Sequence, residues 1–281
     1  MNKPNPITKL SHDSAPEMNT AGDAKISFDV GRDYVEQGRY LKAKGIFEKL
    51  LEIEPENVDF KIWFGRACLN LGNKYKAQYK FWKAKKEFEI SIALADKILV
   101  DDPSSAPALT NLALTFFNQG KMDVAVAKLS LAVEKDHHYP DAYFHLGSCY
   151  LMKGESDDSY QNFKQAAFLF LEQGETKKCI PIFKQMLEKT PHSLDILKPL
   201  GTAYFKEGQL NQCIHILTKA LRIDPDNSEI LDCLGQAYLG QKNIAKAMEM
   251  FVKEGLAHYR NGKAQTAFKF FAKALEVGNV S

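Results

Sequence analysis

A pattern of small and large apolar residues recurs along this chain, and it constrains the fold more than any other feature. Read from residues 24, 106 and 194, the same offsets give closely matching sets of small, aromatic, glycine and large apolar residues. In the copy that begins at residue 194, these are Gly201, Tyr204, Gly208, Cys213 and Leu217. Apolar residues spaced three and four apart indicate amphipathic helices, and an intervening glycine indicates a turn. Each copy is therefore predicted to form a helix, a turn and a second helix.

Units of 34 residues alternate with longer ones, so the chain divides into three super-repeats. Their paired units are 24–57 with 58–105, 106–139 with 140–193, and 194–227 with 228–281. The last two super-repeats align without a gap at an offset of 88 residues. In both, a second glycine turn precedes an expected third helix, at about 176–189 and 264–277. An odd number of helices is expected to exchange the inner and outer layers of a helical stack.

The order of residues within each unit resembles a known family. In the last unit, Leu234, Gly235, Tyr238, Ala247 and Phe251 follow the order Leu-Gly-x-x-Tyr and then Ala-x-x-x-Phe. This order resembles the tetratricopeptide repeat family, and the likeness covers roughly residues 24–281. The resemblance implies an all-α solenoid of about 14 or 15 helices without a β-sheet. It also implies an intracellular, cytoplasmic scaffold or adaptor that binds proteins and is not an enzyme.

Two segments leave the helix boundaries open. Apolar residues from Ala77 to Leu99 recur at spacings of three and four, which favours one helix over residues 74–100. The internal alignment instead favours a break near residues 83–87. Pro199 falls inside the first helix of its unit, where a proline costs about 3 kcal/mol. That helix is expected either to begin late, near Lys198, or to kink.

Composition indicates a folded chain whose overall charge does not favour nucleic acid or an anionic membrane. The 281 residues are 45% hydrophobic, and 37 Lys and Arg nearly balance 35 Asp and Glu, for a net charge of +2. Five separated cysteines without a C-x-x-C pair indicate reduced thiols. Residues 1–23 are expected to be a flexible polar tail without an export signal. The sequence contains no apolar run near the roughly 18 residues that a membrane span needs.

Motifs for catalysis and metal binding are absent from the sequence. It contains no phosphate-binding loop, dinucleotide fingerprint, H-E-x-x-H or G-x-S-x-G. Its seven histidines are scattered, with no pair placed four residues apart on one helix face. No catalytic residue, cofactor or metal is therefore expected.

The resemblance also implies where a partner would bind, on one face of the first helix of each unit. The candidate positions are Phe28, Arg32, Ile62, Trp63, Arg66, Asn111, Leu114, Phe144 and His145. The Lys and Asn clamp that grips acidic chaperone tails in one subgroup is not matched, since Phe28, Arg32 and Trp63 occupy its first three positions. The remaining face is apolar and aromatic with isolated arginines. It suits a peptide or an amphipathic helix with apolar anchors, and also self-association.

Trp63 is the expected centre of this candidate groove, because Arg32 and Arg66 occupy equivalent positions in neighbouring units. Tryptophan and arginine are typical of binding hot spots. The alternative is that Trp63 only packs against residues 30–34.

A second candidate surface is basic. Residues 74–86 hold six lysines and no acidic residue, and Tyr75, Tyr79 and Trp82 are interleaved with the lysines. On one continuous helix, one sector would contain Lys76, Lys80 and Lys83, and the adjacent sector Tyr75, Tyr79 and Trp82. Such a ridge suits an acidic protein, nucleic acid or an anionic lipid surface. The alternative is a solvated ridge whose aromatics pack on the neighbouring helix. An accessory protein that binds nucleic acid or anionic lipid is thus the second functional hypothesis, although the near-neutral charge argues against nucleic acid.

Overall fold

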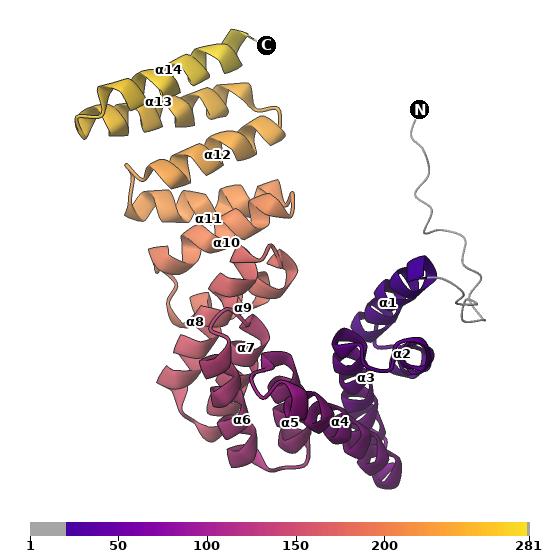
Figure 1. Cartoon of the computed structure of the whole chain (residues 1–281). Helices are drawn as coiled ribbons and strands as arrows, with labels where there is room; N and C mark the ends of the chain where they lie inside the picture. The colour runs from indigo at the N-terminus through magenta and orange to yellow at the C-terminus, as the bar shows by residue number, and fades with distance from the viewer. Residues whose placement is uncertain (1–20, 280–281) are drawn as a thin grey trace. The chain divides into compact units, whose positions relative to one another are not determined.

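The computed structural model describes residues 21–279 and divides into two compact units, Met1–His137 and His138–Ser281. The first unit contains α1 (Ala21–Glu36), α2 (Tyr40–Ile53), α3 (Val58–Ala77), α4 (Phe81–Asp101), α5 (Ala106–Asn118) and α6 (Met122–Lys135) (Figure 1). The second contains α7 (Pro140–Lys153), α8 (Ser156–Glu172), α9 (Thr176–Lys189), α10 (Leu194–Lys206), α11 (Leu210–Ile223), α12 (Ser228–Gly240), α13 (Ile244–Arg260) and α14 (Ala264–Asn279). Fourteen helices and no strand within residues 21–279 confirm the predicted fold class.

Consecutive helices pack in a fixed register. A small residue on one helix lies sixteen residues before a large apolar residue on the next, as Gly235 does before Phe251. A β-carbon added at Gly235 would lie 2.4 Å from the Phe251 ring, so only glycine fits there. The small residues of the hairpins within residues 21–279 are Gly31, Gly72, Ala113, Gly147, Ala167, Gly201, Gly235 and Gly255. Seven residues after each of them, the backbone turns through a positive φ.

Two helices of the second unit, α8 and α13, each belong to two hairpins. On α8, Phe163 packs against Gly147 of α7, and Ala167 lies sixteen residues before the buried Phe183 of α9. On α13, Gly255 packs against the ring of Phe271 of α14. In the same way, the ring of Phe251 of α13 packs against Gly235 of α12. The third helices, α9 and α14, lie where the sequence predicts them. Because α10 contacts both α8 and α12, it shares a layer with α8, in agreement with the expected exchange of layers.

The prediction of one helix over residues 74–100 is wrong. α3 ends at Ala77, residues 78–80 form a turn, and α4 begins at Phe81, earlier than the alternative break. Tyr79 occupies the left-handed position of this turn with a φ of 59°, where most other hairpins have glycine. A turn without glycine carries no sequence signal, which is why periodicity favoured a continuous helix.

Gly72, which the repeat alignment placed in a turn, lies inside α3 and packs against Phe88. A β-carbon there would lie 2.6 Å from the ring of Phe88. Gly65, which the alignment placed at the close-packing position, would make only ordinary contacts from 3.6 Å outwards. The true register of this unit is therefore shifted by seven residues.

Prolines lie inside two consecutive helices. α10 begins at Leu194, so the predicted late start near Lys198 is wrong, and Pro199 is its sixth residue. Pro181 is likewise the sixth residue of α9. Each proline lacks the N–H that would bond the carbonyl four residues earlier.

The super-repeat boundaries stay a sequence prediction. α3, α5, α7, α10 and α12 begin at residues 58, 106, 140, 194 and 228, where the sequence units begin. The two compact units, however, meet at residue 137, inside the second super-repeat. The expected tail, residues 1–23, lies outside the described residues except for the first turn of α1. None of the helices within residues 21–279 is long and apolar enough to cross a membrane.

Candidate protein-binding surface

Most of the candidate groove residues lie on three helices of the first unit that share a layer. α3 contacts α1 on one side and α5 on the other. α1 carries Phe28 and Arg32, and α3 carries Ile62, Trp63 and Arg66. The remaining candidates are Asn111 and Leu114 on α5, and Phe144 and His145 on α7 of the second unit.

Two arginines flank Trp63. The guanidinium carbon of Arg32 lies 4.8 Å from the centre of the Trp63 ring, and that of Arg66 lies 5.1 Å from it. Arg32 also lies 5.8 Å from the ring of Phe28. These distances are within the range of cation–π attraction. Arg32 is exposed and forms no ion pair with any acidic residue in the described part of the chain. We call Phe28, Arg32, Trp63 and Arg66 the Trp63 surface.

The Trp63 surface rests on the core of the first unit. Trp63 and Phe28 pack against a buried cluster that includes Phe47 and Phe60. The ring of Phe28 lies 5.3 Å from that of Phe60 and 6.2 Å from that of Phe47. Val30 and Tyr34 pack against the same buried cluster, and direct packing of Trp63 on residues 30–34 stays a sequence prediction. The core thus holds the aromatic rings in place beneath the two guanidinium groups.

The candidates on α5 are structural residues. Asn111 is 2% exposed, and its side-chain amide donates a hydrogen bond to the backbone carbonyl of Ile62 at 2.9 Å. Leu114 packs against the cluster formed by Leu69, Ala84 and Phe88. Asn111 therefore joins α5 to α3, and its amide is not available to a partner.

The candidates on α7 belong to the packing of the second unit. The Phe144 ring lies 5.6 Å from the ring of Phe163 and 5.2 Å from that of His145. Phe144 also packs against the large core cluster of this unit. Both residues belong to the other compact unit, and they are not part of the Trp63 surface.

The basic ridge is divided by the α3–α4 turn and does not form two sectors of one helix. Tyr75 and Lys76 lie on α3, Tyr79 and Lys80 lie in the turn, and the other two candidates lie on α4. The Lys76 amine donates a hydrogen bond to the backbone carbonyl of Asn118 at 2.5 Å. Lys76 therefore binds the C-terminal end of α5.

The aromatics of the ridge differ in exposure. Tyr75 packs against the cluster with Leu69 and Phe88, as the packing alternative predicts. Tyr79 is 83% exposed and Trp82 is 80% exposed, and the Lys85 amine lies 5.7 Å from the Trp82 ring. The packing alternative is therefore wrong for Tyr79 and Trp82.

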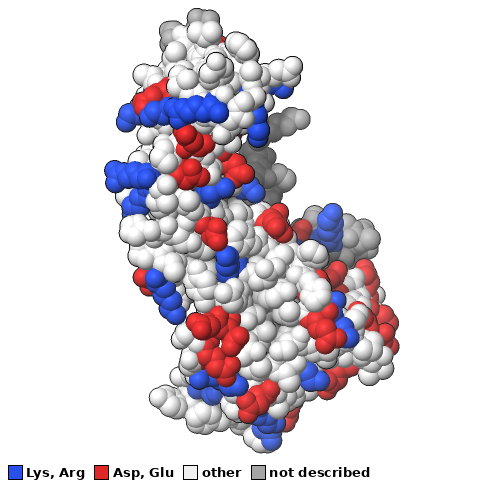
Figure 2. Space-filling model, turned by 90° about the vertical axis from the view of Figure 1, so that its left-hand side faces the viewer, with Lys and Arg blue, Asp and Glu red and all other residues white. Residues whose placement is uncertain are grey.

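Burial raises the pKa of the Cys149 and Cys179 thiols to about 11, so both remain protonated at neutral pH. Residues 21–279 contain no cluster of His, Cys, Asp and Glu that could hold a metal ion. On the face shown in Figure 2, acidic and basic side chains are scattered among uncharged ones, without a continuous field of either sign.

Comparison with known proteins assigns the family. Models of the tetratricopeptide repeat match residues 34–78, 111–170 and 170–232, which together span more than half of the chain. The chain belongs to the tetratricopeptide repeat family. Tetratricopeptide repeats are protein-binding scaffolds, so the family assigns a protein-interaction role in general terms.

Individual tetratricopeptide repeat relatives match only in part. The RNA polymerase-associated protein CTR9 of Caenorhabditis elegans is 23% identical over 199 residues, which cover 64% of this chain and 16% of that protein. The STIP1 homolog of Dictyostelium discoideum is 35% identical over 104 residues, 34% of this chain and 17% of that protein. The matches thus span less than a fifth of these relatives. The structure of the APC/C hetero-tetramer Cut9–Hcn1 is similar with a TM-score of 0.40 and 14% identity, over 93% of this chain and 54% of that chain.

Proposed function

We propose that the chain is an intracellular scaffold that binds a partner protein through the Trp63 surface and carries out no chemical step. The observation that supports this function is the pair of guanidinium groups over one tryptophan, at 4.8 and 5.1 Å. Arg32 is exposed, so its N–H donors are available for a carboxylate while its guanidinium lies against the ring. A rigid aromatic beside arginines is also the composition typical of binding hot spots.

The partner that suits this surface is a peptide or an amphipathic helix with apolar anchors and at least one carboxylate. The anchors would contact Trp63 and Phe28, and the carboxylate would pair with Arg32. The described cysteines are all free thiols, four of them buried, which is consistent with a reducing compartment.

Charge reversal at Arg32 tests this function without disturbing the core. Arg32 is exposed, whereas Trp63 packs on the buried cluster, so Arg32→Glu removes a contact residue at little cost in stability. The full chain is used as bait in affinity capture, followed by mass spectrometry. We expect Arg32→Glu to lose the captured proteins at an unchanged melting temperature. The double variant Trp63→Ala with Arg66→Glu is expected to lose them as well.

The matched control is Lys49→Glu on α2, which makes the same charge change at another exposed position. This variant is expected to keep the captured proteins. Retention of the same proteins by Arg32→Glu would show that the Trp63 surface is not the binding site.

A second candidate function rests on the exposed Tyr79 and Trp82 beside Lys85. Exposed aromatics with lysines suit phosphate-bearing polymers or surfaces, by base stacking or by insertion at a lipid interface. The test is titration with a fluorescent oligo-dT and with phosphatidylserine vesicles at increasing salt. Binding that falls steeply with salt and is lost in Tyr79→Ser with Trp82→Ser would support this function. Absence of binding to both at low salt would exclude it.

A further inference from the structure

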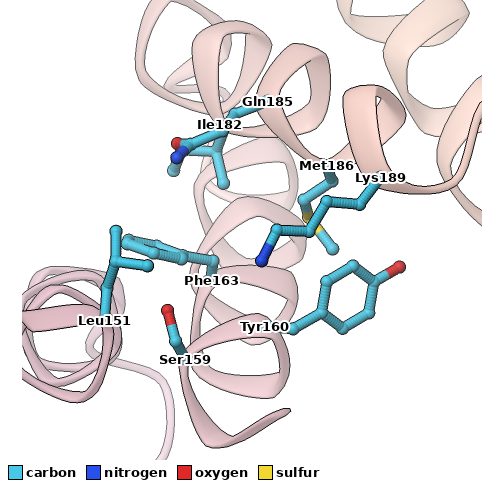
Figure 3. A pocket seen from close by; sticks show the side chains of 8 residues that line it. All are labelled: Leu151, Ser159, Tyr160, Phe163, Ile182, Gln185, Met186 and Lys189. Atoms are coloured by element: carbon cyan, nitrogen blue, oxygen red, sulfur yellow. The ribbon is translucent and has the colours of Figure 1, made fainter. Parts of the chain in front are cut away.

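A small cavity lies between α7, α8 and α9 in the second unit. Its volume is about 50 Å³, and its apolar wall is formed by Leu151 of α7, Phe163 of α8, and Ile182 and Met186 of α9 (Figure 3). Phe163, Ile182 and Met186 are buried, whereas Leu151 is exposed. The cavity is therefore apolar inside and open to solvent on one side.

Two polar groups without partners face this cavity. Ser159 is 2% exposed, its hydroxyl points into the cavity, and no residue within 21–279 forms a hydrogen bond with it (Figure 3). Lys189 reaches back from the last turn of α9 across the cavity, and it forms no ion pair with any described residue (Figure 3). The Ser159 hydroxyl lines the open cavity, so it is available to a ligand or to water.

The repeat itself does not require a hydroxyl at this position. Ser159 lies four residues before the large residue Phe163, at a site that each hairpin fills with a small buried residue. The other hairpins within residues 21–279 have Ala43, Ala84, Ala125, Cys179, Cys213, Ala247 and Ala267 there. Ser159 is thus the exception among eight equivalent positions.

The third super-repeat has apolar residues at the equivalent positions. Eighty-eight residues further along the chain, Ser159 corresponds to Ala247 and Lys189 to Val277. Ala247 and Val277 pack together with Leu239, Phe251 and Ala274 in one apolar cluster. The corresponding helices of the third super-repeat therefore pack with apolar residues at both positions, so the fold does not require the two polar groups.

We propose that this cavity binds one aliphatic side chain of a partner peptide, with a carboxylate on the neighbouring residue. An apolar cavity of about 150 Å³ holds a benzene ring, so one of about 50 Å³ holds two or three carbon atoms, such as the end of a leucine, isoleucine or methionine side chain. A phenylalanine ring is too large. The Lys189 amine pairs with the carboxylate, and the Ser159 hydroxyl bonds a polar backbone group of the peptide.

The charges around the cavity also orient the peptide. Asp157 and Asp158 lie in the first turn of α8, next to Ser159, and would repel a carboxylate. Lys189 lies in the last turn of α9, where a cation is also favourable to the helix dipole. The carboxylate of the peptide therefore lies towards the C-terminal end of α9.

Methyl NMR of the full chain tests this site directly. The probe is the blocked peptide acetyl-Gly-Ser-Leu-Glu-Ser-Gly-amide, added to protein with labelled Ile and Met methyl groups. We expect saturable shifts of the Ile182 and Met186 signals. Replacing Leu by Phe or Ala in the peptide should abolish saturation. Replacing Glu by Gln should weaken binding by about fivefold, the upper range for an exposed ion pair.

Variants of the protein complete the test. Lys189→Gln should weaken binding about fivefold, and Lys184→Gln, an exposed residue of the same helix outside the cavity, should leave it unchanged. Ile182→Phe introduces the residue found at the equivalent position 270 and should close the cavity. Should that variant fail to fold, Ser159→Ala, which introduces the residue found at the equivalent position 247, should weaken binding while it keeps the melting temperature.

Three results would overturn the proposal. The first is the absence of a saturable shift at the solubility limit of the peptide. The second is equal affinity of Lys189→Gln and the unchanged protein. The third is a second copy of the chain as occupant, shown by a dimer in sedimentation equilibrium that shifts the same methyl signals and resists competition by the peptide.

Discussion

Gly72 on α3 faces Phe88 on α4 so closely that a β-carbon at position 72 would lie 2.6 Å from the ring. Gly72→Ala should therefore destabilise the first unit by about 1–3 kcal/mol, because the ring must move into a packed core. Urea denaturation followed by circular dichroism measures this change.

The matched control is Gly45→Ala on α2. Gly45 has no atom within 4 Å of a β-carbon, so its replacement should stabilise the helix by about 0.5–1 kcal/mol. Equal effects of the two substitutions would contradict the role of Gly72.

Lys242 occupies the left-handed turn position between α12 and α13, with a φ of 60°. Its side chain is exposed, so replacement by glycine should remove backbone strain without loss of packing. We expect Lys242→Gly to raise the free energy of unfolding by about 0.5–1 kcal/mol. A lower melting temperature than that of the unchanged chain would contradict this explanation.

Asn111 joins α5 to α3 through its hydrogen bond to the Ile62 carbonyl. Asn111→Ala should cost about 1–2 kcal/mol of stability and leave the affinity for a captured partner unchanged. Asn118→Ala is the control, because the Asn118 amide bonds only the Leu114 carbonyl of its own helix. A loss of partner binding in Asn111→Ala at unchanged stability would show that Asn111 contacts the partner.

Glu254 on α13 is buried, and burial raises the pKa of its carboxyl group to about 8. Asp232 of α12 raises this pKa further, whereas Lys273 of α14 lowers it. Between the ordinary value of 4.5 and 8, the folded chain holds a proton that the unfolded chain has released. Stability contributed by this group is therefore present at low pH and is lost as the pH rises through the folded value.

Glu254→Gln isolates this effect. Between pH 5.5 and 8.5, the unfolding free energy of the unchanged chain should fall by on the order of 2 kcal/mol relative to that of Glu254→Gln. Other titrating groups cancel in the difference. Parallel pH profiles of the two proteins would show that Glu254 is ionised when folded.

The helices were predictable because their signals are local. Apolar spacing and glycine turns locate nearly every helix, including α9 and α14, which lie outside the 34-residue pattern. The α3–α4 turn was not predicted, because Tyr79 adopts the left-handed conformation that glycine has in most of the other turns. The spacing of sixteen residues between Gly72 and Phe88 would have located this turn. That spacing can be recognised only when the close contact between the two residues is known.

The candidate binding surface was predictable only in part. The sequence placed Arg32, Trp63 and Arg66 on one face, and the structure brings both arginines to the tryptophan ring. The same reasoning selected Asn111, which is buried, because position on a helix face does not reveal how closely the next helix packs. The cavity at Ser159 was not predicted from the sequence for a related reason. An unfilled volume depends on how several side chains pack at once.

The sharing of α8 and α13 between two hairpins limits how this molecule can be rebuilt. In the first unit each helix belongs to a single hairpin, so a hairpin is the natural module for deletion or duplication. In the second unit, removal of α9 would expose one face of α8 and return α10 to the opposite layer. The smallest exchangeable modules there are three-helix blocks, α7–α9 and α12–α14, and any graft, truncation or insertion must respect their edges.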